Sequence, residues 1–268
     1  MGGYYAVIYT EKRREAKEAA ERAKRFLEER GGLVELKSAS QITDRKLPKV
    51  DLAIALGGDG TILKTVKALP DPTIPILGVN FGRGGFLMEA EADMLEEALD
   101  KIVNRDYELE KAMMIAIETE GGIIGDFLNE IYITSQAFGK LLKARVTKDG
   151  AEIVEVEADG LIISTPVGST AYAYSAGGPI VDDDIEAAII AAVCPISNFR
   201  PIVLSLNREF NIEVTSNYGI SAMLDGFIKK KFNEQVLRLK FRKSDKAATF
   251  IRLGLGESFA KRVRKKLG

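Results

Sequence analysis

The sequence predicts an α/β protein in two parts: an N-terminal α/β domain with a doubly wound, mostly parallel sheet, and a mostly antiparallel all-β C-terminal domain. Two observations predict this division. Strand-like and helix-like segments alternate over residues 4–103, which is typical of a parallel, right-handed α/β sheet. From about residue 107 the pattern changes to short β-rich runs separated by Gly, Asn and Asp, which favour antiparallel pairing.

The expected elements of the first part rest on apolar runs and glycine stops. Residues 11–30 are rich in Ala, Glu, Lys and Arg, and predict a helix that Gly31 and Gly32 end. The apolar run Val50–Leu56 predicts a buried parallel strand. The remaining expected elements are strands at Tyr4–Tyr9, Leu33–Lys37 and Ile74–Val79 and helices at Ile62–Leu69 and Ala92–Val103.

Short β-rich runs dominate the second part. We expect one helix within it, at Asp183–Ala191, and a further helix at Glu257–Leu267. The expected strands are Ile115–Thr119, Ile131–Thr134, Ala144–Lys148, Ile153–Val156, Leu161–Ile163, Ile202–Leu206, Ile212–Thr215, Val236–Phe241 and Thr249–Leu253.

Three closely spaced glycines surround an aspartate directly after Val50–Leu56. In Gly57–Thr61 the glycines permit a sharp turn and let backbone N–H groups approach a ligand, and the N-terminus of the following helix favours anions. The spacing fits neither a P-loop nor the dinucleotide fingerprint. Asp59 places a carboxylate where polyphosphate oxygens repel it unless it binds a cation or accepts a proton. The loop therefore indicates phosphoryl transfer; the alternative is an ordinary turn with a helix-capping aspartate.

A second segment, Asp159–Ile180, is rich in small hydrogen-bonding residues and glycines. Tyr172 and Tyr174 within it can stack on a base. Such a concentration of polar groups in a connecting segment indicates a ligand site, although each hydroxyl alone is also compatible with a turn or a cap. The hydroxyl residues are Ser164, Thr165, Ser169, Thr170 and Ser175.

These motifs together resemble the NAD kinase family, whose members phosphorylate NAD on its adenosine ribose to give NADP. The resemblance joins Gly57–Thr61, the pair Asn129-Glu130 and Asp159–Ile180, and it extends from about residue 50 to the C-terminus. Phosphofructokinases and diacylglycerol and sphingosine kinases carry strings similar to Gly-Gly-Asp-Gly, whereas the second segment is specific. In the family the C-terminal segment returns to the first domain. We therefore expect a nucleotide-phosphate domain at 1–106 with 245–268, and a β-rich NAD-binding domain at 107–244.

The resemblance implies a role for each site residue. Asp59 would deprotonate the ribose 2′-hydroxyl, which then attacks the γ-phosphate of ATP. Mg²⁺, or another divalent cation, would accompany ATP and be held mainly by its phosphates. Lys64 and Arg83 are weaker candidates for phosphate contacts. The residues implied to bind phosphate are Gly57, Gly58, Gly60 and Thr61, and those implied to bind NAD are Asn129, Glu130, Asp159, Thr170, Ala171, Tyr172 and Ser175.

Three positions depart from the family pattern. Val167 stands where threonine is common, Phe227 where glutamine is common, and Ile196 where histidine is common. These departures bear on nucleotide affinity and on the preference between NAD and NADH, and not on Asp59. Without the resemblance, Asn129-Glu130 before a strand is also compatible with a turn. Two other functions stay open: a lipid kinase of the diacylglycerol or sphingosine type, and a non-catalytic NADP-binding module.

Composition excludes several chemistries and localisations. The chain has no histidine, which removes Ser-His-Asp and Cys-His catalysis and leaves a carboxylate, lysine or tyrosine as the base. Cys194 is the single cysteine, so no intrachain disulfide is possible, and we expect it to be a buried small residue. The net charge of −1, the absence of a membrane-length apolar run and the absence of a leader pattern predict a cytoplasmic protein that binds neither nucleic acid nor membrane. The expected partners are ATP, or polyphosphate as donor, and NAD; the resemblance implies a homodimer or homotetramer.

Overall fold

The computed structural model describes residues 2–42, 47–82 and 85–267, and the chain divides into two compact units. Unit 1 contains residues 1–112 and 247–268, and unit 2 contains residues 113–246. Each unit has its own hydrophobic core. None of the helices in the described ranges is long and apolar enough to cross a membrane.

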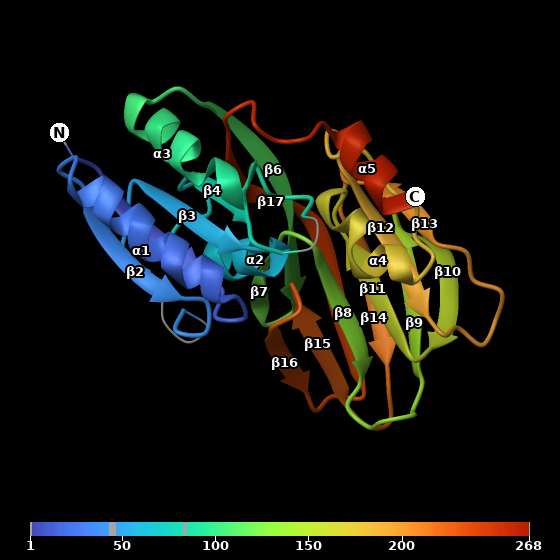
Figure 1. Ribbon diagram of the computed structural model, residues 1–268. Coiled ribbons are helices and arrows are strands. Elements are labelled where there is room, and N and C mark those ends of the chain that lie inside the picture. The colour runs from blue at the N-terminus through green and yellow to red at the C-terminus, as the bar shows by residue number, and fades with distance from the viewer. Residues whose placement is uncertain (1, 43–46, 83–84, 268) are drawn as a thin grey trace. The chain divides into compact units, whose positions relative to one another are not determined.

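Unit 1 contains a parallel sheet in the order β2-β1-β3-β4 (Figure 1). The last residues of the long strand β17 and the short strand β5 continue it in parallel beside β4. The alternation of strands and helices therefore produces the predicted parallel sheet. The strands are β1 (Tyr4–Tyr9), β2 (Leu33–Ser38), β3 (Leu52–Gly57), β4 (Ile76–Asn80), β5 (Ala90–Glu91) and β17 (Val236–Arg252).

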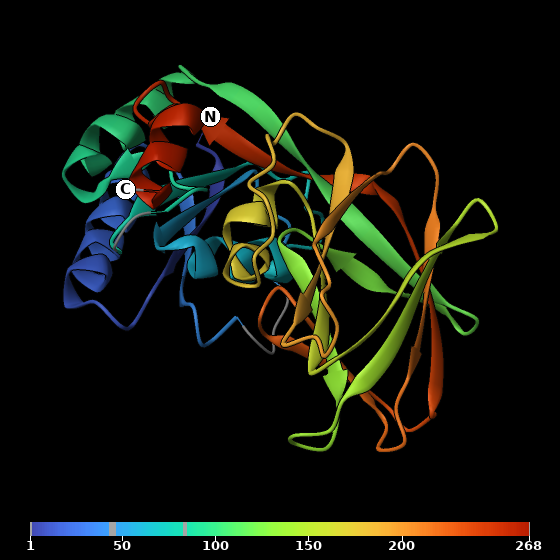
Figure 2. The ribbon, with the colours of Figure 1, turned by 90° about the vertical axis from the view of Figure 1, so that its right-hand side faces the viewer.

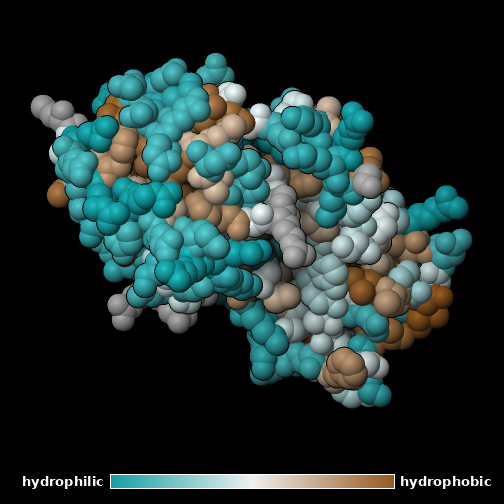
Figure 3. Space-filling view, in the orientation of Figure 1, coloured by the Kyte–Doolittle hydropathy of each residue, from teal (hydrophilic) through white to brown (hydrophobic). Residues whose placement is uncertain are grey.

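Helices cover both faces of this sheet, which makes it doubly wound. Helices α1 (Arg14–Glu28) and α3 (Leu95–Asn104) share one core with residues of β1, β3 and β4, and the polar side of α1 faces water (Figure 3). Helix α2 (Asp59–Ala68) packs on the other face, where Ile62 lies over Gly78 so closely that an added Cβ there would be 2.6 Å from it. A one-turn 3-10 helix, η1 (Ala92–Met94), precedes α3, and α5 (Phe259–Leu267) lies in the C-terminal part of unit 1.

Unit 2 is a sandwich of antiparallel strands around one apolar core (Figure 2). One sheet has the order β13-β12-β11-β8-β15-β16, and the other contains β10-β9-β14-β17 with β6 and β7. The strands are β6 (Glu108–Thr119), β7 (Gly122–Phe127), β8 (Glu130–Ser135), β9 (Leu142–Lys148), β10 (Ala151–Ala158), β11 (Gly160–Ser164), β12 (Ala187–Val193), β13 (Ile202–Ser205), β14 (Phe210–Thr215), β15 (Ile220–Leu224) and β16 (Ile228–Phe232).

The helix expected at Asp183–Ala191 is wrong, because the chain forms strand β12 from Ala187 to Val193 and no helix over the described residues 183–186 before it. Ala188 and Ile190 point into the sandwich core, whereas Ala191 packs on the opposite face against Ile162 and Ala173. A strand buried on both faces shows no period of two, so its apolar run cannot be told from a buried helix by pattern alone. Helix α4 (Tyr172–Ser175) packs on this opposite, outer face of the sheet through Ala173.

Two smaller expectations also differ from the structure. The runs Val236–Phe241 and Thr249–Leu253 belong to the single strand β17. Cys194 is exposed and not buried, because it follows β12 in a turn with a φ of 49°. A residue in that turn cannot reach either core.

We predict that Ala191→Leu destabilises unit 2 by about 1–3 kcal/mol, because the larger side chain overpacks the layer between β12 and α4. Val203→Leu on β13 is the control, since Val203 is 45% exposed. Urea denaturation of the two variants and the wild type measures the difference. Equal stability of Ala191→Leu and the control would contradict the packing described for β12.

Candidate functional site

The loop between β3 and α2 presents backbone groups at the carboxyl end of a parallel strand. Gly57 ends β3 and is closely packed, since an added Cβ would lie 2.2 Å from the Thr61 hydroxyl. Gly58 and Gly60 have open space where a Cβ would be. The first hydrogen bonds of α2 run from the N–H groups of Thr61 and Ile62 to the Gly58 carbonyl, at 2.7 and 3.4 Å. The N–H groups of Asp59 and Gly60 precede these bonds and therefore favour an anion at this end of the helix.

The carboxylate of Asp59 is held by the chain segment that follows β4. Its Oδ2 accepts a hydrogen bond from the backbone N–H of Phe86 at 2.9 Å, and its Oδ1 accepts one from Leu87 at 3.0 Å. Asp59 is the first residue of α2 and makes no capping bond to it, so the helix-capping alternative is wrong. The carboxylate is shielded although the residue as a whole keeps some exposure.

Opposing effects act on the proton affinity of Asp59. Burial is the largest and raises the pKa of its carboxyl above the ordinary value. The two backbone N–H groups and the positive charges of Arg262 and Lys266 on α5 lower the pKa, but less than burial raises it. The net result is a carboxylate with an increased affinity for a proton, which is the property a general base needs.

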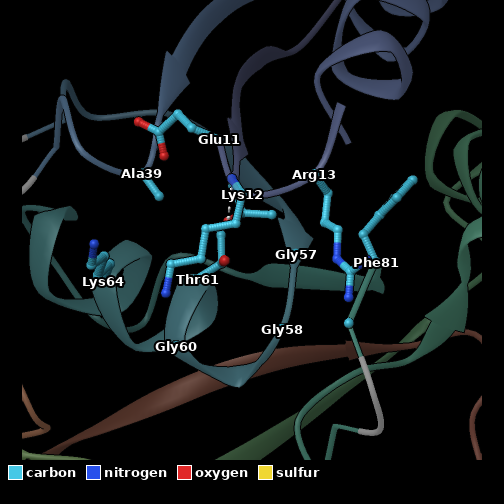
Figure 4. A pocket seen from close by; sticks show the side chains of 12 residues that line it. Glu11, Lys12, Arg13, Ala39, Gly57, Gly58, Gly60, Thr61, Lys64 and Phe81 are labelled. Carbon is cyan, nitrogen blue, oxygen red and sulfur yellow. Dashed lines mark hydrogen bonds between the residues drawn. The ribbon is translucent and has the colours of Figure 1, made fainter. Parts of the chain in front are cut away.

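A pocket of about 360 Å³ opens beside this loop in unit 1 (Figure 4). Its walls combine the glycine loop with basic side chains: Lys12 and Arg13 follow β1, and Lys64 projects from α2. Glu11 accepts a hydrogen bond from the backbone N–H of Ser40 on the neighbouring loop. Burial raises the pKa of Glu11, but hydrogen bonds, chiefly from Ser38 and Ser40, together outweigh burial and lower this pKa to about 2. Arg83, the other phosphate candidate from the sequence, lies outside the described residues. Three basic side chains therefore line the pocket beside the helix N-terminus.

In unit 2 the predicted pair Asn129 and Glu130 lies at the start of β8, and both residues are buried. Asn129 Oδ1 and Glu130 Oε2 are buried atoms with no hydrogen-bond partner in the structure. Burial, and secondly the charge of Asp225, raise the pKa of Glu130 to about 7. Buried acceptors without partners are costly, so their presence points to a ligand that supplies donors.

Asp225 fixes the backbone that carries Asn129 and Glu130. The sequence predicted no role for Asp225. Its carboxylate accepts the N–H groups of Leu128 at 3.1 Å and Asn129 at 2.7 Å. Its own N–H donates to the Glu130 carbonyl at 2.8 Å, and its φ is 49°. The turn signal Asp225-Gly226 after an apolar strand could have indicated such a bend.

The hydroxyls of Ser164 and Thr165 form hydrogen bonds within the protein. Ser164 donates to the Asn129 carbonyl at 3.0 Å, and Thr165 donates to the Leu128 carbonyl at 2.5 Å. Gly168 packs against the same turn, where an added Cβ would lie 2.1 Å from the Asn129 carbonyl oxygen. These residues therefore fix the position of Asn129. The hydroxyl of Ser169 also donates a hydrogen bond within the protein, to the Val181 carbonyl.

The other predicted NAD-binding residues of unit 2 lie along one face of the sheet. Tyr172 is 38% exposed and packs edge-on against Tyr132, with ring centroids 5.3 Å apart. Tyr132 was missed by the sequence reasoning; it covers Gly160, and its signal is the alternation of polar and apolar residues along β8. The predicted residues near Tyr172 are Thr170, which is buried, Ala171, which is half-buried, and Ser175, which is exposed.

Asp159 is not brought next to Glu130. It precedes β11, whereas Glu130 pairs with Ser164 at the far end of that strand, so roughly 16 Å of extended chain separates the two ends. Among the three departures from the family pattern, Val167 begins the 3-10 helix η2 (Val167–Thr170), Phe227 lies in the turn after β15 and Ile196 is 66% exposed.

We predict that the stability of the wild type relative to Glu130→Gln falls as pH rises from about 4.5 to about 7. A carboxyl whose folded pKa is raised stabilises the fold fully below its unfolded pKa and loses this contribution as pH passes the folded pKa. The change is at most about 3 kcal/mol. Urea denaturation at pH 5 and 7.5 measures it, with the exposed Glu157→Gln as control. A parallel pH dependence of all three proteins would contradict the raised pKa.

Comparisons with known proteins agree with this geometry. Residues 9–107 match the ATP-NAD kinase N-terminal domain, and residues 128–253 match the ATP-NAD kinase C-terminal domain. The NAD kinase of Methanothermobacter thermautotrophicus is 35% identical over 269 aligned residues, covering 94% of this chain and 92% of the relative. The NAD kinase of Methanocorpusculum labreanum is 40% identical over 218 residues, covering 81% and 79%.

Solved structures show the same fold. The chain is similar to an NAD kinase from Archaeoglobus fulgidus in complex with ATP, with a TM-score of 0.80, 27% identity and coverage of 99% of this chain and 100% of that one. The yeast NADH kinase shares the fold, with a TM-score of 0.82 at 19% identity and coverage of 99% and 87%. A lipid kinase and a non-catalytic binding module are not favoured by these matches. The chain belongs to the NAD kinase family.

Proposed function

We propose that this protein transfers the γ-phosphoryl group of ATP to the 2′-hydroxyl of the adenosine ribose of NAD, giving NADP. Membership of the NAD kinase family supports the reaction. The observation that carries the assignment of residues is the placement of Asp59: a shielded carboxylate of raised pKa at the opening of α2, directly after the glycine loop. Phosphoryl transfer depends mainly on positioning and charge neutralisation, and this loop provides both.

Asp59 is the proposed general base. As the 2′-oxygen attacks the γ-phosphorus, the bond from that phosphorus to the β,γ-bridging oxygen of ATP breaks, and the hydroxyl proton passes to the carboxylate of Asp59. ADP leaves with the bridging oxygen. The N–H groups of Phe86 and Leu87 fix the orientation of the carboxylate, so that it need not reorganise during the reaction.

The pocket beside the loop is the proposed site of the donor phosphates. The backbone of Gly57, Gly58, Gly60 and Thr61 would approach phosphate oxygens, because Gly58 and Gly60 leave open space there. Lys12, Arg13 and Lys64 would neutralise phosphate charge. The relative from Archaeoglobus fulgidus, which was solved in complex with ATP, supports ATP as donor.

Mg²⁺ is the proposed companion of ATP. The oxygen donors suit a hard cation: ATP phosphates would supply most ligands, and Glu11 adds a carboxylate to the same pocket. When bound, the cation withdraws negative charge from the transferred phosphoryl group.

Asn129 and Glu130 are the proposed partners of the adenosine ribose of NAD. The unpartnered Asn129 Oδ1 and Glu130 Oε2 are acceptors that ribose hydroxyls can satisfy. The exposed ring of Tyr172, with Thr170, Ala171 and Ser175 beside it, would form an adenine pocket. Asp159 would accept from the nicotinamide amide, and its distance along β11 from Glu130 is compatible with the two ends of an extended dinucleotide.

The family resemblance also supports three broader proposals: polyphosphate as a second donor, a cytoplasmic location, and assembly as a homodimer or homotetramer. Sedimentation of the purified protein tests the assembly, and replacement of ATP by polyphosphate tests the donor.

We predict that Asp59→Asn lowers kcat by about 10²–10⁴-fold while nucleotide binding persists, because the amide cannot accept the proton. Formation of NADP from Mg-ATP and NAD, detected with an NADP-specific dehydrogenase, measures turnover. Asp93→Asn is the matched control, since Asp93 is an exposed aspartate on η1. An Asp59→Asn enzyme with more than about a tenth of the wild-type kcat would exclude Asp59 as the base.

A further inference from the structure

Glu89 is a buried carboxylate that the proposed chemistry does not use. It is 4% exposed and follows the segment after β4. Its Oε1 accepts hydrogen bonds from three backbone N–H groups in the C-terminal segment of unit 1. These are the N–H groups of Leu253 at 2.7 Å, Leu255 at 3.1 Å and Gly256 at 3.2 Å. One side chain therefore fixes the whole segment that leaves β17.

Arg252 completes this cluster. Its guanidinium lies 3.4 Å from Oε2 of Glu89 and forms two closer hydrogen bonds to Glu110, at 2.9 and 2.7 Å. The shorter distances show that Glu110 is the main ionic partner of Arg252. Glu89 instead accepts hydrogen bonds from backbone N–H groups. The two carboxylates therefore have different roles, and substitutions at Glu89 and Glu110 can distinguish these roles experimentally.

The two chain segments that Glu89 joins both act on Asp59. Phe86 and Leu87, two and three residues before Glu89, donate their N–H groups to the Asp59 carboxylate. Residues 253–256 lead into α5, whose Arg262 and Lys266 lower the pKa of Asp59. Unit 1 thus contains a closed ring of contacts and charges, which is formed by Asp59, the segment 86–89, residues 253–256 and α5.

We propose that Glu89 is a positioning residue of the phosphoryl transfer: its carboxylate holds residues 253–256 so that the segment 86–87 and helix α5 keep their places around Asp59. The inference rests on the proposed function of Asp59. Within the described part of the chain, the groups that act on Asp59 are the N–H groups of Phe86 and Leu87 and the cations Arg262 and Lys266. Glu89 itself does not contact substrate in this account.

The first test uses hydrogen exchange of the protein without nucleotides and needs no turnover. In Glu89→Leu, which keeps a similar volume but has no acceptor for the three N–H groups, the amides of Phe86, Leu87 and residues 253–267 are expected to exchange at least about tenfold faster, because local opening limits exchange. Glu110→Leu is the matched control: it removes the stronger partner of Arg252 but no bond to residues 253–256, and those amides should keep their wild-type rates. Unchanged exchange in Glu89→Leu would overturn the proposal.

The second test separates positioning from mere stability. Glu89→Leu is expected to lower kcat by about 10- to 100-fold with KM values for ATP and NAD within about twofold. The acidic limb of the kcat/KM profile should move to higher pH, because Arg262 and Lys266 no longer favour the Asp59 anion. Combination with Arg262→Gln should add little further loss, since both changes act through α5. A lower Tm with unchanged kcat and pH profile would assign Glu89 a structural role only.

Gly256→Ala provides a second variant in case Glu89→Leu folds poorly. A Cβ at position 256 would lie 2.7 Å from Oε2 of Glu89 and displace the contact while keeping the carboxylate. It is expected to reproduce the faster exchange and the lower kcat, and wild-type values for both would overturn the proposal. A wild type that makes no NADP would overturn the proposed function instead, and the exchange experiment would still decide whether Glu89 fixes the two segments.

Discussion

The hydrogen bonds from Phe86 and Leu87 to the Asp59 carboxylate are the interaction on which unit 1 depends. They tie the first residue of α2 to the chain that leaves β4, so the glycine loop and that chain become one arrangement at the carboxyl ends of the sheet. Shielding from water raises the proton affinity of the carboxylate, while the N–H groups and the α5 cations limit the rise. A carboxylate held in this way stays oriented, and its proton affinity responds to the charges placed around it.

In unit 2, Asp225 joins two chain segments by hydrogen bonds similar to those of Asp59. Its carboxylate also receives two backbone N–H groups, and together with the Ser164 and Thr165 hydroxyls it fixes the turn that carries Asn129 and Glu130. The protein thereby keeps two acceptors, Asn129 Oδ1 and Glu130 Oε2, buried and without partners. Such groups cost stability in the absence of a ligand, and the cost is compatible with selective recognition of hydroxyl donors.

The sequence predicted the parallel sheet, the antiparallel second part and the glycine loop, because these depend on local patterns of apolar residues and glycine. It failed at β12, where burial on both faces removes the alternation that marks a strand. For the hydroxyls of Ser164 and Thr165 it left both a ligand site and a turn or cap open, and the structure shows that they hold the backbone of Leu128 and Asn129. The roles of Asp225, Tyr132 and Glu89 come from contacts between residues about 30 to 170 positions apart, which no local pattern encodes.

Asp59 is a shielded carboxylate with an increased proton affinity in the folded protein. Its titration by carboxyl-carbon NMR in protein with labelled aspartate, assigned with Asp59→Asn, measures this property without any substrate. We expect a pKa for Asp59 above the ordinary aspartate value of about 3.9. A pKa at or below that value would show that hydrogen bonds and cations dominate over burial, and would contradict the increased proton affinity described for Asp59.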